Sequence, residues 1–202
     1  MTALVLASLL YLPIAPLNPV AQDTLPSLAF HFTGGVTGPN GIVSAGPELS
    51  AKCEMLVLHP FVVRGTVDLR YGRTTSNLFP QGHLYMTTVG ADAIYYRGTH
   101  FLTGYIGFGF LYAFHRFDPF DRTADSLYAS ERVADVQIDP QNGYRLILGL
   151  RYRRSYSLEV SVSEVRPDFR KIGVGEDGSE VRTYQATRTG SFKVTLGYIV
   201  PI

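Results

Sequence analysis

The sequence predicts an all-β fold, an eight-stranded antiparallel up-and-down transmembrane β-barrel. Three observations predict it. Apolar and polar residues alternate with a period of two through most of the chain, as in strands whose two faces meet different environments. The alternating segments are roughly ten residues long, the length that a tilted strand needs to cross a bilayer. The connections between these segments are short and long in turn, a pattern typical of barrels that span membranes.

The composition is that of one ordered domain. The 202 residues are enough for one ordinary domain, and 46% of them are hydrophobic, which excludes a disordered chain. The 18 Lys and Arg residues nearly balance the 17 Asp and Glu residues, so no nucleic-acid partner is expected. A single cysteine, Cys53, excludes an internal disulfide and a cysteine-based zinc site.

The N-terminal segment has the character of an export signal. Residues 2–21 carry no charge, and the almost purely apolar run from Ala3 to Leu12 ends in a proline-rich stretch. This run is shorter than the roughly 20 residues of a transmembrane helix. We therefore predict a secretory signal peptide over residues 1–21 and an outer-membrane β-barrel domain over residues 22–202. The alternative, a buried N-terminal helix, conflicts with the helix-breaking prolines.

Each of the first four predicted strands, at residues 28–33, 47–57, 63–72 and 85–95, has one apolar and one polar face. The apolar faces carry Leu28, Phe30 and Phe32; Leu49, Ala51, Cys53, Met55 and Val57; Val63, Val67, Leu69 and Tyr71; and Tyr85, Val89, Ala91, Ala93 and Tyr95. The polar faces carry His31 and Thr33; Glu48, Ser50, Lys52 and Glu54; Arg64, Thr66, Asp68 and Arg70; and Thr88, Gly90 and Asp92.

The last four predicted strands, at residues 102–115, 144–152, 157–163 and 191–200, repeat the pattern. Their apolar faces carry Leu102, Ile106, Phe108, Phe110, Tyr112 and Phe114; Tyr144, Leu146, Leu148, Leu150 and Tyr152; Leu158, Val160 and Val162; and Phe192, Val194, Leu196, Tyr198 and Val200. Their polar faces carry Thr103, Gly107, Gly109 and His115; Arg145, Gly149 and Arg151; Ser157, Glu159, Ser161 and Ser163; and Ser191, Lys193, Thr195 and Gly197.

The connections fall into two classes. Short turns are predicted at residues 58–61, 97–100 and 153–155, and long connections at 37–46, 73–82, 117–142 and 166–182. Since consecutive strands run in opposite directions, all short turns lie at one end of the barrel. That end is expected to be periplasmic, and the even number of strands places both termini there.

The apolar face is predicted to point outward. A soluble barrel such as a lipocalin also alternates, but its apolar residues point inward. Here tyrosines and phenylalanines gather near both ends of the apolar face, as in the aromatic girdles of membrane proteins. The polar face carries opposite charges in nearly equal number, which can pair inside a barrel but would cost about 2–4 kcal/mol for each Arg or Lys facing lipid at the midplane.

We therefore predict a charge network in the lumen. Its eleven members are Glu48, Lys52, Glu54, Arg64, Asp68, Arg70, Asp92, Arg145, Arg151, Glu159 and Lys193. Eight strands leave an interior just wide enough for side chains, and glycines on the polar face leave room for long arginine side chains. We favour a packed polar plug over the alternative, a conducting pore.

The eight strands, three tight turns and four longer connections resemble the small outer-membrane barrels of Gram-negative bacteria. This group includes the OmpA transmembrane domain, the Ail and OmpX group, and the outer membrane protein beta-barrel domain families. The last strand, from Ser191 to Tyr198, resembles the C-terminal signal read by the barrel-assembly machinery, although the chain ends on Ile202 rather than on an aromatic residue. The resemblance implies location in the bacterial outer membrane. It also implies outer-membrane lipid, lipopolysaccharide and the assembly machinery as partners.

No catalytic residues are predicted. Barrel enzymes that act on lipid A use a histidine with a serine and an acidic partner. His115 falls on the polar face instead, and His83, on the apolar face, has no evident serine and carboxylate in phase. We interpret all five histidines (His31, His59, His83, His100 and His115) as polar residues of the rim or lumen.

The two longest connections are the candidate surfaces for an extracellular ligand. The segment 117–142 is rich in acidic residues, but their spacing matches no calcium loop, so neither a metal nor a cofactor is predicted. Residues 126–129 are predicted to extend strands above the membrane. Asp177-Gly178, within 166–182, is a hairpin signal, so the last two strands are predicted to protrude there as a hairpin.

We expect an integral outer-membrane protein without enzymatic activity that has a structural or surface-interaction role. The alternatives are a lipid A-modifying barrel enzyme of the acyl hydrolase or transferase type and a porin-like pore for small solutes. Mass spectrometry of lipid A tests the first alternative, and conductance measurements test the second.

Overall fold

The computed structural model describes residues 25–39, 43–74, 82–99, 101–119, 131–165, 168–175, 180–186 and 189–202. The predicted signal peptide, at residues 1–21, and the predicted strand extension at 126–129 lie outside these residues. No helix long and apolar enough to cross a membrane occurs in the described part of the chain.

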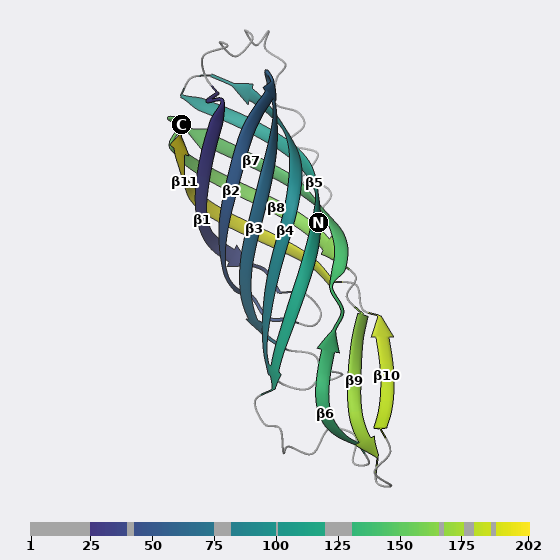
Figure 1. Cartoon of the computed structure of the whole chain (residues 1–202). Helices are drawn as coiled ribbons and strands as arrows, with labels where there is room; N and C mark the ends of the chain where they lie inside the picture. The colour runs from purple at the N-terminus through teal and green to yellow at the C-terminus, as the bar shows by residue number, and fades with distance from the viewer. Residues whose placement is uncertain are drawn as a thin grey trace, which may run out of the picture.

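Eight strands form a closed antiparallel barrel, as predicted (Figure 1). Each strand pairs with the next barrel strand along the chain, and β1 pairs with β11 to close the ring. The strands are β1 (Leu28–Thr37), β2 (Gly46–Leu58), β3 (Phe61–Arg73), β4 (Gly82–Gly98), β5 (Leu102–Pro119), β7 (Gln141–Tyr152), β8 (Tyr156–Val165) and β11 (Thr189–Pro201).

The strands are staggered as well as paired. A line drawn across the strands from Ile199 on β11 passes through His31 on β1 and Lys52 on β2. Continued through the six remaining pairs, it returns to β11 at Thr189, ten residues before Ile199. Such a stagger requires the strands to tilt relative to the barrel axis. Because of the tilt, side chains that are not register partners can lie at the same height inside the barrel.

The three predicted short turns are confirmed, and they lie at one end of the barrel. His59 and Pro60 connect β2 to β3, and residues 153–155 connect β7 to β8. In the second turn Arg153 and Arg154 have φ angles of 47° and 60°, a left-handed conformation found in tight turns. The start of β1 and the end of β11 lie at this same end, where Ala29 pairs with Pro201. We call this the short-turn end.

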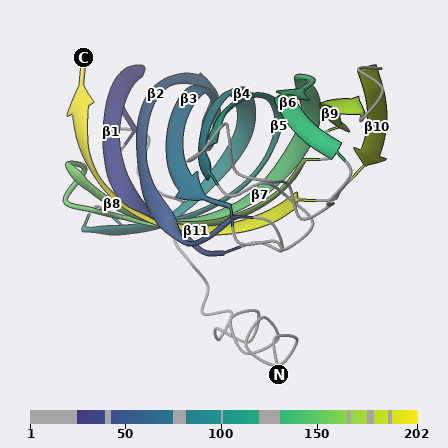
Figure 2. The same cartoon turned by 90° about the horizontal axis from the view of Figure 1, so that it is seen from below.

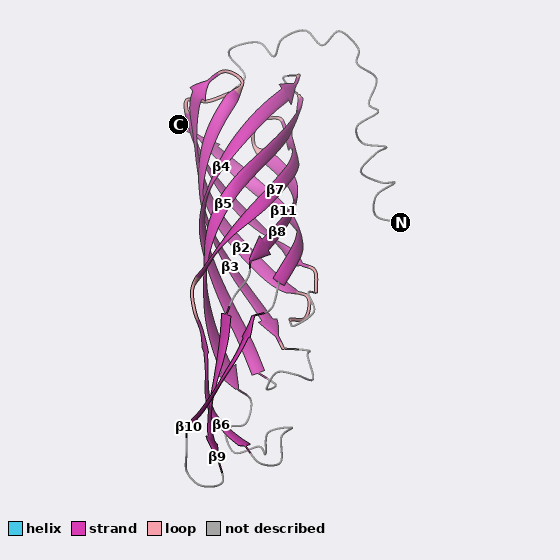
Figure 3. Ribbon diagram, turned by 90° about the vertical axis from the view of Figure 1, so that its right-hand side faces the viewer, coloured by secondary structure: helices cyan, strands magenta, loops and turns pink. Residues whose placement is uncertain are grey.

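The two longest connections contain a second sheet, which the sequence predicted only in part. The strands β6 (Glu131–Ile138), β9 (Asp168–Gly175) and β10 (Glu180–Ala186) form an antiparallel sheet in the order β10-β9-β6. The predicted hairpin is present as β9 and β10, but these strands are separate from β8 and β11. Pairing of β9 with β6 links the two connections. Figure 3 shows this sheet beyond the end of the barrel opposite the short turns, and Figure 2 shows it to one side of the barrel strands.

The predicted orientation of the two faces is confirmed. Phe108 and Leu148 point outward, with 43% and 42% of their surface exposed, whereas Arg64 is fully buried inside. Leucine, valine and phenylalanine cover the outer wall of every barrel strand. In water so large an apolar surface would drive aggregation, whereas in hydrocarbon it is the favoured surface. A closed barrel also leaves no strand edge unpaired in the lipid.

Aromatic side chains flank the apolar band at both ends. Toward the short turns, the rings of Tyr156 and Tyr198 lie 5.7 Å apart, and Phe61 packs beside Tyr95. Toward the other end, the rings of Tyr71 and Tyr85 lie 5.4 Å apart. Tyrosine side chains prefer the level of the lipid headgroups, so these groups mark the two membrane–water interfaces.

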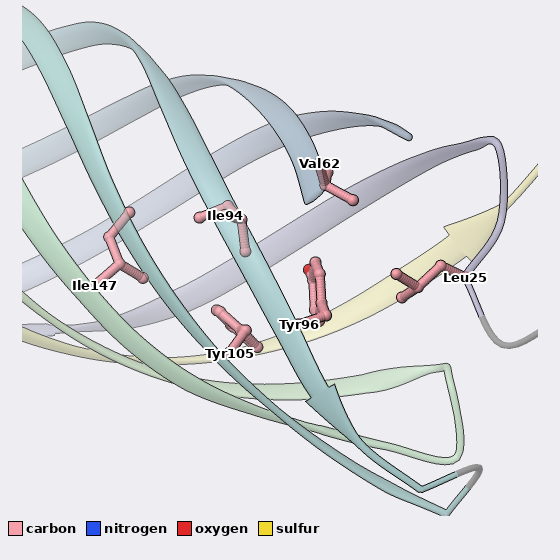
Figure 4. Packing of buried hydrophobic residues seen from close by; sticks show 6 residues of the cluster. All are labelled: Leu25, Val62, Ile94, Tyr96, Tyr105 and Ile147. Carbon is pink, nitrogen blue, oxygen red and sulfur yellow. The ribbon is translucent and has the colours of Figure 1, made fainter. Parts of the chain in front are cut away.

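The barrel interior also contains an apolar cluster, in addition to the charges that the sequence predicts. Near the short-turn end, Leu25 packs inside the barrel with Tyr96 and Tyr105 (Figure 4). The other members are Val62, Ile94 and Ile147. Leu25 comes from the segment before β1, so the chain entering the barrel helps to fill its short-turn end.

Candidate functional site

All eleven residues predicted for the lumen lie inside the barrel and are buried, each with at most 6% of its surface exposed. They come from β2, β3, β4, β7, β8 and β11, where the alternation of the strand points them inward. Ten of them make ion pairs with one another in three connected groups, ordered along the barrel.

The first group surrounds Glu54, near the short-turn end. Its Oε2 atom accepts a hydrogen bond of 2.6 Å from Arg151 Nη2 and lies 3.1 Å from His31 Nε2. Its Oε1 atom accepts a hydrogen bond of 2.6 Å from the Tyr96 hydroxyl. The Arg151 guanidinium also lies 4.7 Å from the centre of the Tyr96 ring, a cation–π contact. Both oxygens of this buried carboxylate therefore have hydrogen-bond partners that replace water.

The second group occupies the middle of the barrel. Glu159 accepts hydrogen bonds from Lys52 Nζ at 2.9 Å, from Arg64 Nη1 at 2.6 Å and from the Tyr105 hydroxyl at 3.1 Å. Arg64 Nε donates to Asp92 at 2.9 Å, and Arg145 Nε donates to the other oxygen of Asp92 at 2.6 Å. Arg64 and Asp92 thus connect the Glu159 group to the third group.

The third group lies toward the end of the barrel that carries the long connections. Arg145 Nη1 and Lys193 Nζ lie 2.8 Å and 3.2 Å from Asp68 Oδ2. Lys193 Nζ also donates to Glu48 at 2.5 Å, and Glu48 accepts a further hydrogen bond from the Thr37 hydroxyl. Arg145 in addition donates to the Thr66 hydroxyl. Charges are tolerated in a low-dielectric interior when they are paired and hydrogen-bonded in this way.

Arg70 differs from the other ten. Its Nη2 donates to the backbone carbonyl of Gly38 at 3.2 Å, and the Ser44 carbonyl lies 3.5 Å away. Both carbonyls belong to the connection between β1 and β2. Arg70 therefore ties that connection to the barrel wall.

Several interior residues of the network were not predicted as members. Tyr96 and Tyr105 donate to Glu54 and Glu159, and Thr88 donates to Asp68 at 3.0 Å. Both tyrosines occupy inward-facing positions of their strands, and this phase was the feature of the sequence that could have indicated their place in the network. Two glycines make room: a Cβ atom at Gly109 would overlap the Asp92 carboxylate, and one at Gly149 would overlap the Tyr105 ring.

One cavity between these side chains is small. Its volume is about 20 Å³, and it lies in the half of the barrel away from the short turns. Its lining includes Glu48, Asp68, Arg70, Arg145 and Lys193. This volume is enough for about one water molecule.

The described histidines lie at separate places, and His100 is outside the described residues. His31 is in the interior beside Glu54, and His83 is on the outer wall, where its Nδ1 lies 2.5 Å from the Tyr71 hydroxyl. Asp118 on β5 is the register partner of His83, which places a carboxylate on the same face as this histidine. Within the described ranges, no group of three or more His, Cys, Asp or Glu residues is arranged to hold a metal ion.

A scan against protein-family profiles finds no match, and no curated protein matches the sequence. Solved structures do match in fold. The outer membrane protein OprG from Pseudomonas aeruginosa has a TM-score of 0.62 at 12% identity, and the match covers 91% of this chain and 100% of OprG. The outer membrane protein AlkL, solved in lipid bilayers, has a TM-score of 0.53 at 14% identity, over 92% and 96% of the two chains.

Neisserial surface protein A has a TM-score of 0.50 at 13% identity, over 85% of this chain and 96% of that protein. At these identities the likeness shows a shared fold. Added to an apolar outer wall with aromatic girdles and a charged interior, the fold decides the location. The chain is a small outer-membrane β-barrel. In the outer-membrane barrel fold the short turns face the periplasm and the longer connections face the outside of the cell.

Proposed function

We propose that this outer-membrane β-barrel is a non-enzymatic structural and surface-interaction protein, in which a sealed barrel anchors the extracellular β6-β9-β10 sheet. The observation that carries the proposal is the interior network of paired charges. Ten charged side chains from six strands connect across the lumen. A route for solutes would have to break several of these pairs.

Two further features support a sealed barrel. The cavity between the network residues has room for about one water molecule. At the periplasmic end, Leu25, Tyr96 and Tyr105 pack together inside the barrel. An apolar cluster in series with an ion-pair network opposes passage of both ions and water.

The sealed barrel predicts low conductance. The purified full-length protein, inserted into planar lipid bilayers in concentrated KCl, is expected to produce no steady, porin-like current steps, because paired side chains fill the lumen. Gel mobility of the same preparation, unheated and boiled, is the control that the inserted protein is folded. Large and steady steps from a preparation with the mobility of the folded form would refute the sealed barrel.

The extracellular sheet is the proposed interaction surface. Its order, β10-β9-β6, leaves β6 and β10 as the edge strands of this sheet within the described residues. An edge strand presents unpaired backbone N–H and C=O groups and can accept a strand from another molecule. We propose an extended peptide segment of a surface-bound partner as the ligand.

Deleting residues 172–181, which include the end of β9, the start of β10 and the residues between them, tests this surface. Bacteria that display the deleted protein are expected to lose adhesion to a protein-coated surface, because two of the three strands of the sheet are disrupted. The barrel pairing does not involve these residues, so heat-modifiable gel mobility is expected to persist. Full adhesion by the deleted protein would exclude the sheet as the interaction surface.

A further inference from the structure

The interior of the barrel carries more positive than negative charge. Among the described residues, the buried cations are Lys52, Arg64, Arg70, Arg145, Arg151 and Lys193, and the buried carboxylates are Glu48, Glu54, Asp68, Asp92 and Glu159. One cation is therefore in excess. Protonation of His31 or His115, which also lie on the polar face, would only enlarge this excess.

Arg70 is the cation in excess. Its register partner on β2, Glu48, pairs with Lys193 instead, and within the described ranges no carboxylate forms an ion pair with Arg70. The side chain is buried, with 6% of its surface exposed. Its Nη2 donates to two backbone carbonyls, while its Nε has no hydrogen-bond partner among the described residues. A buried charge with so few partners is costly unless a counter-charge lies beside it.

Arg70 lines the cavity of about 20 Å³ in the lumen, and other hydrogen-bond donors line it too. The Lys193 ammonium has three N–H groups, of which its two carboxylate partners use two. The hydroxyls of Ser163 and Ser191 lie 2.6 Å apart, so one donates to the other. The hydrogen of the second hydroxyl is then left for another acceptor. These donors favour a ligand that only accepts hydrogen bonds.

One acceptor in the cavity wall opposes such a ligand. Asp68 also lines the cavity, and its Oδ1 has no hydrogen-bond partner among the described residues. However, its Oδ2 lies 2.8 Å from Arg145 and 3.2 Å from Lys193, and it accepts a hydrogen bond from Thr88. Two cations therefore already neutralise this carboxylate, whereas Arg70 has none of its own.

The size of the cavity restricts the ligand further. Its volume holds about one particle of the size of a water molecule. A halide ion is of this size, whereas sulfate, phosphate and organic carboxylates are larger. The remaining wall is apolar and is formed by Met86, Leu111 and Val165.

We propose that this cavity binds one monovalent anion of the halide type, such as chloride, between Arg70 and the Ser163–Ser191 pair. The anion accepts charge-assisted hydrogen bonds from the Arg70 guanidinium and neutralises the excess charge of the interior. Because Arg70 also donates to the carbonyls of Gly38 and Ser44, the bound anion fixes the side chain that holds the connection between β1 and β2. The inference goes beyond the proposed function and does not depend on the β6-β9-β10 sheet.

The test measures chloride binding to the folded, full-length protein in zwitterionic micelles. Chloride is titrated against gluconate, which is too large for the cavity, at a constant ionic strength of about 0.15 M, so that general screening stays the same. The line width of the ³⁵Cl magnetic resonance signal reports binding, and bromide is the competitor. Urea unfolding in chloride and in gluconate is the second readout.

The wild type is expected to broaden the chloride signal, and bromide is expected to reverse the broadening. At a chloride concentration ten times the dissociation constant, the ratio of folded to unfolded protein is expected to be about tenfold higher than in gluconate. Arg70→Met is expected to weaken chloride binding at least about tenfold, the usual loss for a hydrogen bond to a charged group. Arg70→Lys keeps the charge and is expected to fall between the two.

The double variant Ser163→Ala/Ser191→Ala is expected to weaken chloride binding about fivefold, since it removes a neutral donor and leaves every charge in place. Arg97→Met is the control. Arg97 is exposed on the outer wall at the short-turn end, so its replacement is expected to leave chloride binding unchanged. Heat-modifiable gel mobility of each variant shows that the samples are folded.

Equal chloride affinity in the wild type and Arg70→Met would overturn the proposal. An absence of chloride-dependent broadening in the wild type would also overturn it, and the cavity would then be a site for water. If Arg70→Met does not fold, unchanged affinity in the serine double variant would have the same consequence. A barrel that conducts but keeps its chloride site would refute the sealed lumen alone, so the two proposals fail separately.

Discussion

Replacing Arg145 with methionine is expected to lower the free energy of unfolding by about 3–5 kcal/mol, the usual cost of removing one partner from a buried ion pair. Methionine occupies part of the same volume but cannot donate to Asp92 and Asp68, which accept hydrogen bonds from Arg145 at 2.6 and 2.8 Å. Arg64 would then be left as the ion-pair partner of Asp92. Urea unfolding in phospholipid vesicles, followed by far-ultraviolet circular dichroism, measures the loss in a chain without tryptophan.

Arg97→Met is the matched control for this substitution. Arg97 is exposed on the outer wall at the short-turn end, so its replacement is expected to change stability by no more than about 0.5 kcal/mol. The double variant Arg145→Met/Asp92→Asn is expected to lose less than the sum of its two single variants, since the residues are coupled. A loss below about 1 kcal/mol for Arg145→Met would show that the network contributes little to the stability of the barrel.

Replacing Leu146 with arginine is expected to cost about 2–4 kcal/mol, because this position faces the middle of the hydrocarbon. Leu146 lies halfway along β7, points outward with 57% of its surface exposed, and has Phe108 and Val162 as neighbours on the adjacent strands. In a water-soluble barrel the same substitution would place a charge in solvent at almost no cost. The free energy of unfolding in phospholipid vesicles distinguishes these cases.

The control for depth is Leu58→Arg. Leu58 is also exposed, at 69%, but it ends β2 at the short-turn rim. A charge at the interface is expected to cost about 0–1 kcal/mol. Equal effects at the two positions would contradict the membrane orientation of the outer wall.

The barrel could be predicted because lipid imposes a simple rule on each strand. Between Val63 and Tyr71 every outward residue is apolar or glycine and every inward residue is polar, so the face of each side chain follows from sequence alone. The rule ends where the strands leave the membrane. The strand predicted over residues 102–115 continues to Pro119. This extension was not predicted, because the stretch from His115 to Asp118 has polar residues in both phases and no lipid selects one face.

The same limit explains the small β6-β9-β10 sheet. Asp177-Gly178 signalled a hairpin, and β9 and β10 flank it. The strand β6, from Glu131 to Ile138, lies in an acidic segment without a clean alternation, and its partner β9 is 30 residues or more away along the chain. Periodicity carries no information on such a pairing.

The partners within the lumen could not be predicted either. Lys52 and Glu159 were both predicted to point inward, but their contact joins residues 107 positions apart. It depends on the stagger of the strands, which brings distant register lines to one height. Leu25 gave no signal, because a single apolar residue ahead of the first strand has no periodicity.

The ion pair between Lys193 and Glu48 joins residues 145 positions apart, from the last barrel strand and the second. A chain that has not yet added β11 lacks the ammonium group for Glu48 as well as the backbone partners of β1. Exposing that carboxylate and an open strand edge to acyl chains would be costly at the same moment. Membrane insertion strand by strand is therefore unfavourable for this sequence, and the strands are expected to enter the bilayer together, with ring closure and charge neutralisation completed in one cooperative step.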